Sequence, residues 1–156
     1  MYTARNYIKA QSLAQAHALN QRRANAILGG GCWMRMGERM YDTLIDLSGL
    51  GLDQIQDRGE EAALGAMVTL RQLETNFMLE KCFDGLFRKC TQHIVGVQFR
   101  NCATLGGSVY SRFGFSDIVT ALLALSCQVE LAGAGLIPLE EYVKQQEEAL
   151  KRDHNK

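Results

Sequence analysis

Apolar and polar residues alternate in short blocks along the chain, and these blocks predict a mixture of helices and strands. Apolar runs predict strands near residues 26–28, 43–46 and 62–68. Alanine content and helical spacing predict helices near residues 12–21, 70–74 and 76–92. A further helix is expected over residues 118–125, because Ser116 precedes its periodic apolar positions as a candidate N-cap. The pattern is therefore that of a mixed α and β protein.

The end of the chain has a weaker apolar pattern. Leu139, Val143 and Leu150 follow helical spacing among Gln, Glu and Lys residues. This pattern predicts a solvated terminal helix, with docking onto a partner protein as the alternative.

Glycine supplies most of the turn-forming residues, with fifteen glycines and a single proline. The first cluster, Gly29, Gly30 and Gly31, follows a short apolar run ending at Leu28 and precedes a possible helix turn at residues 32–36. Such a loop brings backbone N–H groups close to a phosphate, because no Cβ stands in the way. A tight turn that needs positive φ angles explains the triplet equally well. No GxGxxG dinucleotide fingerprint is present.

A second cluster joins two glycines to two hydroxyl residues, in the order Thr104, Leu105, Gly106, Gly107 and Ser108. Hydroxyls and glycine amides are donors suited to a phosphate or a sugar. Asp117 follows in the first turn of the helix predicted behind Ser116. The commoner role of such a carboxylate is to complement the helix dipole, and the functional one is to accept hydrogen bonds from ribose or ribityl hydroxyls.

Composition and charge exclude several classes of function. The 156 residues carry 17 basic and 17 acidic side chains, so no net field attracts nucleic acid or an anionic membrane. Residues 119–137 are apolar but interrupted by Gln128, Glu130 and two glycines, which rules out one membrane-spanning helix there. The amino terminus lacks the pattern of a signal peptide, so we expect a cytoplasmic protein.

Local signatures of side-chain catalysis and of metal binding are also missing. The five cysteines form no CxxC pair, and their odd number favours reduced thiols. The three histidines have neither HxxxH nor HExxH spacing, and no serine stands in a GxSxG motif. We therefore expect no metal site and no catalytic acid, base or nucleophile.

Three segments together resemble a known family. The strings ILGGG at 27–31, LGAMVTL at 64–70 and RNCATLGGS at 100–108, followed by Ser116 and Asp117, match in order and spacing the FAD-binding subunit of the xanthine dehydrogenase and carbon monoxide dehydrogenase family of molybdenum hydroxylases. The resemblance extends from about residue 5 to residue 142, and its most specific element is the Arg-Asn-x-Ala-Thr-x-Gly-Gly string at 100–107.

The resemblance implies a set of cofactor-binding residues. In the family the first loop reads Ala-Gly-Gly-Thr-Asp and its amides hold the FAD pyrophosphate. The matching residues, after Leu28, are Gly29, Gly30, Gly31, Cys32 and Trp33. Because Cys32 stands where threonine is usual and Trp33 where aspartate is usual, only the backbone contacts carry over.

The second loop of the family reads Thr-x-Gly-Gly-Asn and contacts the phosphates and the ribityl chain. The resemblance therefore places Thr104, Leu105, Gly106, Gly107 and Ser108 at the cofactor, with Ser108 in the place of asparagine. Asp117 keeps the hydroxyl-binding position of the family's Ser-Pro-x-Ser-Asp motif. We expect Gly106→Val to abolish FAD retention without unfolding the protein.

The resemblance also implies a fold. It is the α+β, two-lobed FAD-binding domain of the molybdopterin dehydrogenase (PCMH-like) type, without the C-terminal domain that usually follows. Residues 1–50 would form a small lobe, residues 51–143 a larger lobe and residues 144–156 a polar tail, with FAD between the lobes.

The implied function is that of an FAD-binding electron-transfer subunit of a xanthine dehydrogenase-like oxidoreductase. Its partners would be a molybdopterin-binding large subunit and a [2Fe-2S] small subunit, with NAD as the electron acceptor and neither nucleic acid nor membrane involved. Electrons would pass from the iron–sulfur clusters through FAD to NAD, and purine-type hydroxylation is expected from family frequency.

Two alternatives remain at this point. One is a truncated structural or assembly subunit that has lost flavin binding, and the other is a binding module for ADP-like nucleotides without redox use. The flavin hypothesis requires the two glycine clusters to converge, so that exposed main-chain amides hold one diphosphate.

Overall fold

The computed structural model describes residues 1–145. Its amino-terminal part is a parallel three-stranded sheet with strand order β1-β3-β2. The strands are β1 (Thr3–Lys9), β2 (Ala26–Leu28) and β3 (Met40–Asp46), and helix α1 (Leu13–Asn20) connects β1 to β2. Ser12 caps α1 by accepting a hydrogen bond from the Gln15 amide at 3.1 Å, so the expected helix near residues 12–21 is confirmed.

The register of this sheet decides where the first glycine cluster lies. Lys9 of β1 and Leu28 of β2 both pair with Asp46, the last residue of the central strand. The three strands therefore end at the same edge, and Gly29 leaves the sheet there. Ligands of parallel sheets bind outside this carboxyl edge. Behind it, Ala10, Ala16, Ile45 and Leu47 form a small apolar cluster.

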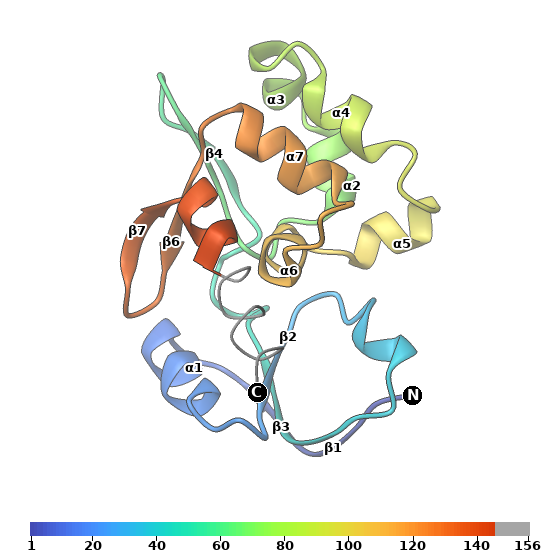
Figure 1. The fold of residues 1–156 in the computed structure, drawn as a ribbon, viewed down its shortest axis with the longest axis vertical. Helices are drawn as coiled ribbons and strands as arrows, with labels where there is room; N and C mark the ends of the chain where they lie inside the picture. Colours follow the sequence, from blue (N-terminus) through green and yellow to red (C-terminus); the bar gives the residue numbers. More distant parts are fainter. Residues whose placement is uncertain (146–156) are drawn as a thin grey trace.

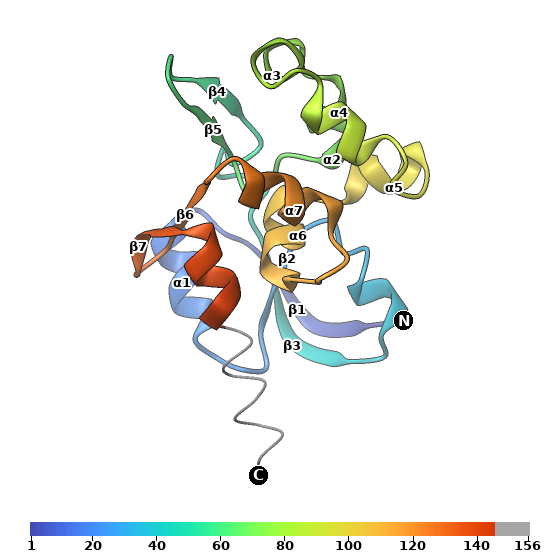
Figure 2. The ribbon, with the colours of Figure 1, turned by 45° about the horizontal axis from the view of Figure 1, so that its top comes forward.

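The rest of the described chain forms two antiparallel strand pairs, the six helices α2 to α7 and a further helix that begins at Leu139. The strand pairs are β4 (Ile55–Asp57) with β5 (Ala62–Leu64), and β6 (Gln128–Leu131) with β7 (Gly135–Pro138). The helices are α2 (Leu70–Thr75), α3 (Phe77–Cys82), α4 (Leu86–Thr91), α5 (Val97–Cys102), α6 (Leu105–Ser111) and α7 (Asp117–Ala124). Helix α6 lies between the other helices and strand β2 in both views of the ribbon (Figure 1, Figure 2).

Side-chain caps explain several of these short helices. Thr69 and Gln72 form a capping box at the start of α2, Asn76 caps α3 and Ser116 caps α7. The cap predicted at Ser116 is thus confirmed. The caps hold helices of six to eight residues around a larger apolar cluster, which includes Val68, Leu73, Leu79, Phe87 and Ile118.

Three expectations from the sequence are wrong in detail. The single helix expected over residues 76–92 is two helices, because Asp84 and Gly85 adopt positive φ angles of 48° and 69° between them. The strand expected over residues 62–68 ends at Leu64, where Gly65 packs against the Leu52 backbone. The residues of the second glycine cluster are helical rather than a loop.

The terminal segment also differs from the prediction. A helix begins at Leu139, and both Leu139 and Tyr142 are buried in the larger apolar cluster, so this segment is part of the core rather than solvated. Leu150 and most of the predicted polar tail lie outside the described residues. Among the described residues, no helix combines the length and the apolar character needed to cross a membrane.

Candidate functional site

The first glycine loop presents a row of backbone donors. Within residues 1–145, the backbone amides of residues 29–33 donate no hydrogen bond to another residue. Two hydrogen bonds fix the conformation of the loop. The Gly31 carbonyl accepts from the Arg35 amide at 3.0 Å, and the Trp33 carbonyl accepts from the Met36 amide at 3.1 Å. Residues 29–32 are half-buried. Half-buried amides without a protein partner form an arrangement that suits an anion.

The two glycine clusters lie against one another, as the flavin hypothesis requires. A Cβ built on Gly30 would stand 1.7 Å from the carbonyl oxygen of Cys102, and one on Gly29 would stand 2.9 Å from Oγ1 of Thr104. Both distances are shorter than ordinary contact. Only glycine permits this approach of two backbones that are about seventy residues apart in sequence. The predicted convergence is therefore confirmed.

The expectation of free amides in the second cluster is wrong. The Leu105 amide donates to the Val68 carbonyl at 2.8 Å, and the Gly106 amide donates to the Ala66 carbonyl at 2.8 Å. The Gly107 amide donates to Oγ1 of Thr104 at 3.2 Å, and the Ser108 amide donates to the Thr104 carbonyl. The segment is the capped first turn of α6, bonded to the strand-like stretch before α2. The amides of residues 105–108 therefore have partners, whereas those of the first loop have none within the residues that the structure describes.

Gly106 permits the close approach of α6 to the stretch before α2. A Cβ at Gly106 would stand 2.7 Å from the Ala66 carbonyl oxygen, which belongs to a backbone that is itself hydrogen-bonded. A valine at this position would push α6 away from that stretch. The expectation that Gly106→Val spares the fold is therefore wrong, and the variant cannot report on cofactor binding alone.

Arg100 holds the segment that carries the second cluster. Its Nε donates to Glu74 Oε2 at 2.8 Å, its Nη2 donates to Glu74 Oε1 at 3.3 Å and its Nη1 donates to the Ile94 carbonyl at 3.1 Å. The Arg100 side chain is only 6% exposed. Hydrogen bonds from Arg100 lower the pKa of Glu74, against the opposing effect of its burial. Sequence reasoning singled out Arg100 as a motif residue, but nothing in the motif indicates that α2 supplies its partner.

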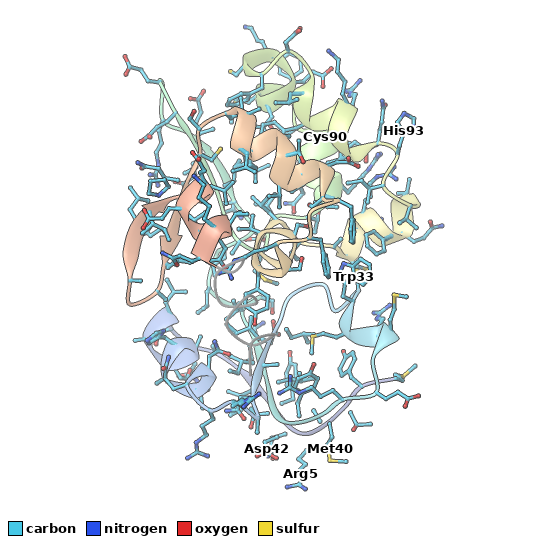
Figure 3. All side chains as sticks on the ribbon, in the orientation of Figure 1. Arg5, Trp33, Met40, Asp42, Cys90 and His93 are labelled. Atoms are coloured by element: carbon cyan, nitrogen blue, oxygen red, sulfur yellow. The ribbon has the colours of Figure 1, made fainter. Side chains whose placement is uncertain are left out.

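Aromatic rings connect the first loop to the segment before α7. The Trp33 ring centroid lies 4.9 Å from that of Phe113 and 6.1 Å from that of Phe115, and the two phenylalanine rings stack at 4.9 Å. Trp33 is 51% exposed and lies where the sheet part meets the helical part (Figure 3). Nothing in the sequence pattern indicates that Trp33 of the first loop packs against Phe113 and Phe115.

Asp117 lies two residues beyond the aromatic cluster. It occupies the first turn of α7, as predicted, and its side chain is exposed. Its charge contributes to raising the pKa of Cys90 on α4, after the larger effect of burial. No hydrogen bond of the Asp117 carboxylate to another residue is found in the part of the chain that the structure describes.

A second polar group marks the carboxyl edge of the sheet. Asp46 accepts hydrogen bonds from the Tyr7 hydroxyl, from the Ser48 hydroxyl at 2.9 Å and from the Ser48 amide at 2.8 Å. Burial acts to raise the pKa of Asp46, but these hydrogen bonds outweigh it and the pKa is lowered. These contacts satisfy the Asp46 carboxylate locally, which assigns it a structural role.

A cavity of about 240 Å³ begins beside this group, lined among others by Ser48, Met67 and Thr69. Thr69 pairs with Thr104 through an isolated β-bridge, so the cavity adjoins the second cluster. A larger cavity of about 410 Å³ lies on the other side of Gln72, next to Phe77. Neither cavity is lined by the first glycine loop.

These features agree with a known family. A family model described as the FAD binding domain in molybdopterin dehydrogenase matches residues 2–155. The chain belongs to this family. FAD is the cofactor of the molybdopterin dehydrogenase FAD-binding domain, and the α+β fold expected from the sequence is confirmed.

Solved structures of the same fold are oxidoreductases. The chain matches the Cu,Mo-CO dehydrogenase in its cyanide-inactivated form with a TM-score of 0.77 and 23% identity, over 87% of this chain and 51% of that one. It matches the CO dehydrogenase of Hydrogenophaga pseudoflava with a TM-score of 0.77 and 22% identity, over 86% and 50% of the two chains. For quinoline 2-oxidoreductase from Pseudomonas putida 86 the values are 0.71 and 22%, over 88% and 50%.

The chain thus spans about half the length of these structural neighbours. At such identities the likeness shows the fold. No curated protein matches the sequence.

Proposed function

We propose that this chain binds FAD at the first glycine loop and serves as the electron-transferring FAD-binding part of a molybdenum hydroxylase. The observation that carries the proposal is the row of backbone amides at residues 29–33, which find no partner within residues 1–145 and lie directly against Thr104. A diphosphate is the part of FAD whose negative charge such donors match.

The residues present fit this group. Amides of residues 29–33 would hold the diphosphate, and the Thr104 hydroxyl stands next to Gly29 within reach of the same region. The exposed carboxylate of Asp117 would accept hydrogen bonds from sugar or ribityl hydroxyls. Leu28, Leu105, Gly106, Gly107 and Ser108 would then shape and support the site. When bound, the flavin takes up single electrons and releases them as a pair.

The family resemblance also suggests the complex in which the chain acts. We propose a xanthine dehydrogenase-like complex with a molybdopterin-binding large subunit, a [2Fe-2S] small subunit and NAD as the acceptor, acting in the cytoplasm. In this complex residues 1–50 and 51–143 would be the two lobes around FAD. The separate apolar clusters of the sheet part and the helical part support such a division.

The decisive experiment uses Trp33, the single tryptophan of the chain. Because Trp33 is the last residue of the amide row, a bound flavin or adenine ring is expected to quench its fluorescence. Purified protein is titrated with FAD, ADP and FMN, and the bound flavin is read from its visible absorbance after desalting. Binding of FAD with retained absorbance supports the proposal, and a colourless protein whose fluorescence none of the three changes refutes it.

A matched pair of variants tests the role of Asp117. Asp117→Asn removes one charged acceptor and is expected to weaken FAD binding about tenfold or more, since a hydrogen bond to a charged group contributes about 1.5–3 kcal/mol. Glu130→Gln on β6 changes the same charge away from the first loop and is expected to bind FAD as the wild type does. Equal affinities of the two variants would contradict the role given to Asp117.

A second candidate function is favoured by one observation. The amides of the second cluster already donate hydrogen bonds within the protein, so fewer donors are left for a ligand than the family motif predicts. An assembly subunit without flavin would show the same packing. It is distinguished by failing to bind any of the three ligands, whereas a module for ADP-like nucleotides would bind ADP and FAD but show no flavin reduction by NADH.

A further inference from the structure

Two cysteines lie on opposite sides of the contact between the glycine clusters. Cys32 belongs to the first loop, and its Sγ lies 3.8 Å from the Gly30 carbonyl oxygen. Cys102 is the last residue of α5, and its own carbonyl oxygen is the atom against which Gly30 packs. Both cysteines therefore adjoin the same glycine, from two segments that are far apart in sequence.

The Cys102 thiol acts on Cys32 electrostatically. Burial raises the pKa of Cys32, and the charge of Cys102 raises it further. Cys102 is exposed and Cys32 is half-buried. Among the other cysteines of the described residues, Cys90 and Cys127 have pKa values raised mainly by burial.

We propose that Cys32 and Cys102 form a reversible disulfide that pins the first glycine loop to the end of α5 and thereby regulates binding at that loop. The regulatory part rests on the proposed function, whereas formation of the bond does not. The positive φ of Gly31, 67°, places a flexible residue directly before Cys32, so that the Cys32 side chain can turn toward α5.

The chemistry balances with a peroxide as the oxidant. The exposed Cys102 thiolate attacks hydrogen peroxide, whose O–O bond breaks, giving a sulfenic acid and hydroxide. The Cys32 thiolate then attacks the sulfenic sulfur, the S–S bond forms and a second hydroxide leaves. The two thiol protons convert both hydroxides to water, so one peroxide is reduced as two thiols are oxidised. A dithiol reductant reverses the bond by exchange.

The bond would change the amide row. A disulfide places the two Cα atoms about 4.4–6.8 Å apart, and it replaces the present contact of Cys32 with the Gly30 carbonyl. Closing the bond would turn the backbone at Gly31 and Cys32, which redirects the amides of Cys32 and Trp33. Loss of even one amide–phosphate hydrogen bond lowers affinity for a diphosphate about tenfold or more.

The full chain, reduced and desalted, is treated with hydrogen peroxide, alkylated and mapped by peptide mass spectrometry. A cross-linked peptide joining Cys32 and Cys102, absent after dithiothreitol, supports the pairing. The pairing is overturned if the map shows other cysteine pairs but not this one, or shows sulfinic and sulfonic acids without this cross-link. Cys102→Ser, a change at an exposed position, must abolish the cross-link, and Cys82→Ser must leave it.

The regulatory part is tested with ADP, read from Trp33 fluorescence. We expect the oxidised wild type to bind ADP at least tenfold more weakly than the reduced protein, and oxidised Cys102→Ser to bind as reduced wild type does. Equal affinities of the oxidised and reduced wild type overturn the regulation. If the reduced protein binds no ADP, the proposed function fails, while a mapped cross-link still supports the pairing.

Discussion

Gly30→Ala tests the direct contact between the two glycine clusters. The new Cβ would stand 1.7 Å from the Cys102 carbonyl oxygen, whereas ordinary contact begins at 3.4 Å. The two backbones must therefore separate by up to about 1.7 Å. Overpacking of this kind costs about 1–3 kcal/mol, and the upper end applies because the obstacle is main chain rather than a movable side chain. At about 2–4 °C per kcal/mol for a chain of this size, Tm is expected to fall by roughly 6–12 °C.

The assay is thermal unfolding followed by far-ultraviolet circular dichroism, with ADP affinity measured in parallel. Gly114→Ala is the matched control, because nothing lies within 4 Å of its new Cβ. A compatible Gly→Ala change stabilises by about 0.4–1 kcal/mol through the unfolded chain, so Tm of the control should stay or rise slightly. If Gly30→Ala unfolds at the temperature of Gly114→Ala, the contact described for the two clusters is incorrect.

Three further predictions concern the groups that support the site. Arg100→Met removes two hydrogen bonds to the buried Glu74 carboxylate and leaves it the ion pair with Arg71, whose Nη1 lies 2.8 Å from Oε1, so the variant is expected to cost about 1.5–3 kcal/mol in urea unfolding. The double variant Arg100→Met/Glu74→Gln should recover part of that loss, and no recovery would contradict a coupled pair. The pKa of Glu74 is lowered in the folded protein, so its stabilising contribution is present above the ordinary glutamate pKa and is lost as the pH falls through the folded pKa. The free energy of unfolding of Glu74→Gln should therefore fall less steeply at acid pH than that of the wild type. Burial raises the pKa of Cys90 to about 11, so at pH 8 its alkylation should be far slower than that of the exposed Cys82, and equal rates by mass spectrometry would refute this burial.

Local signals made part of the fold predictable. Ser116 was recognisable as a cap because a short hydroxyl before an apolar run satisfies amides of the same helix. Strand β2 was recognisable because its apolar run ends in three glycines. Strand β1 escaped prediction, since nearly all its residues are exposed and it therefore lacks apolar alternation.

Long-range contacts explain what the sequence left unresolved at the site. The convergence of the glycine clusters followed from the family resemblance and is confirmed by the approach of Gly30 to Cys102. The motif does not reveal that Val68 and Ala66 accept the amides of the second cluster, because those carbonyls lie almost forty residues away. Burial of Leu139 was missed for the same reason, since its neighbours are helices that precede it by tens of residues.

The contact of Gly30 with Cys102 also sets an order of events during synthesis. The first loop can find its support only after α5 has emerged from the ribosome, and closure of so long a chain segment is entropically costly. We therefore expect the amino-terminal strands to pair before the amide row gains its support from α5. The cofactor is then expected to bind after these strands have folded.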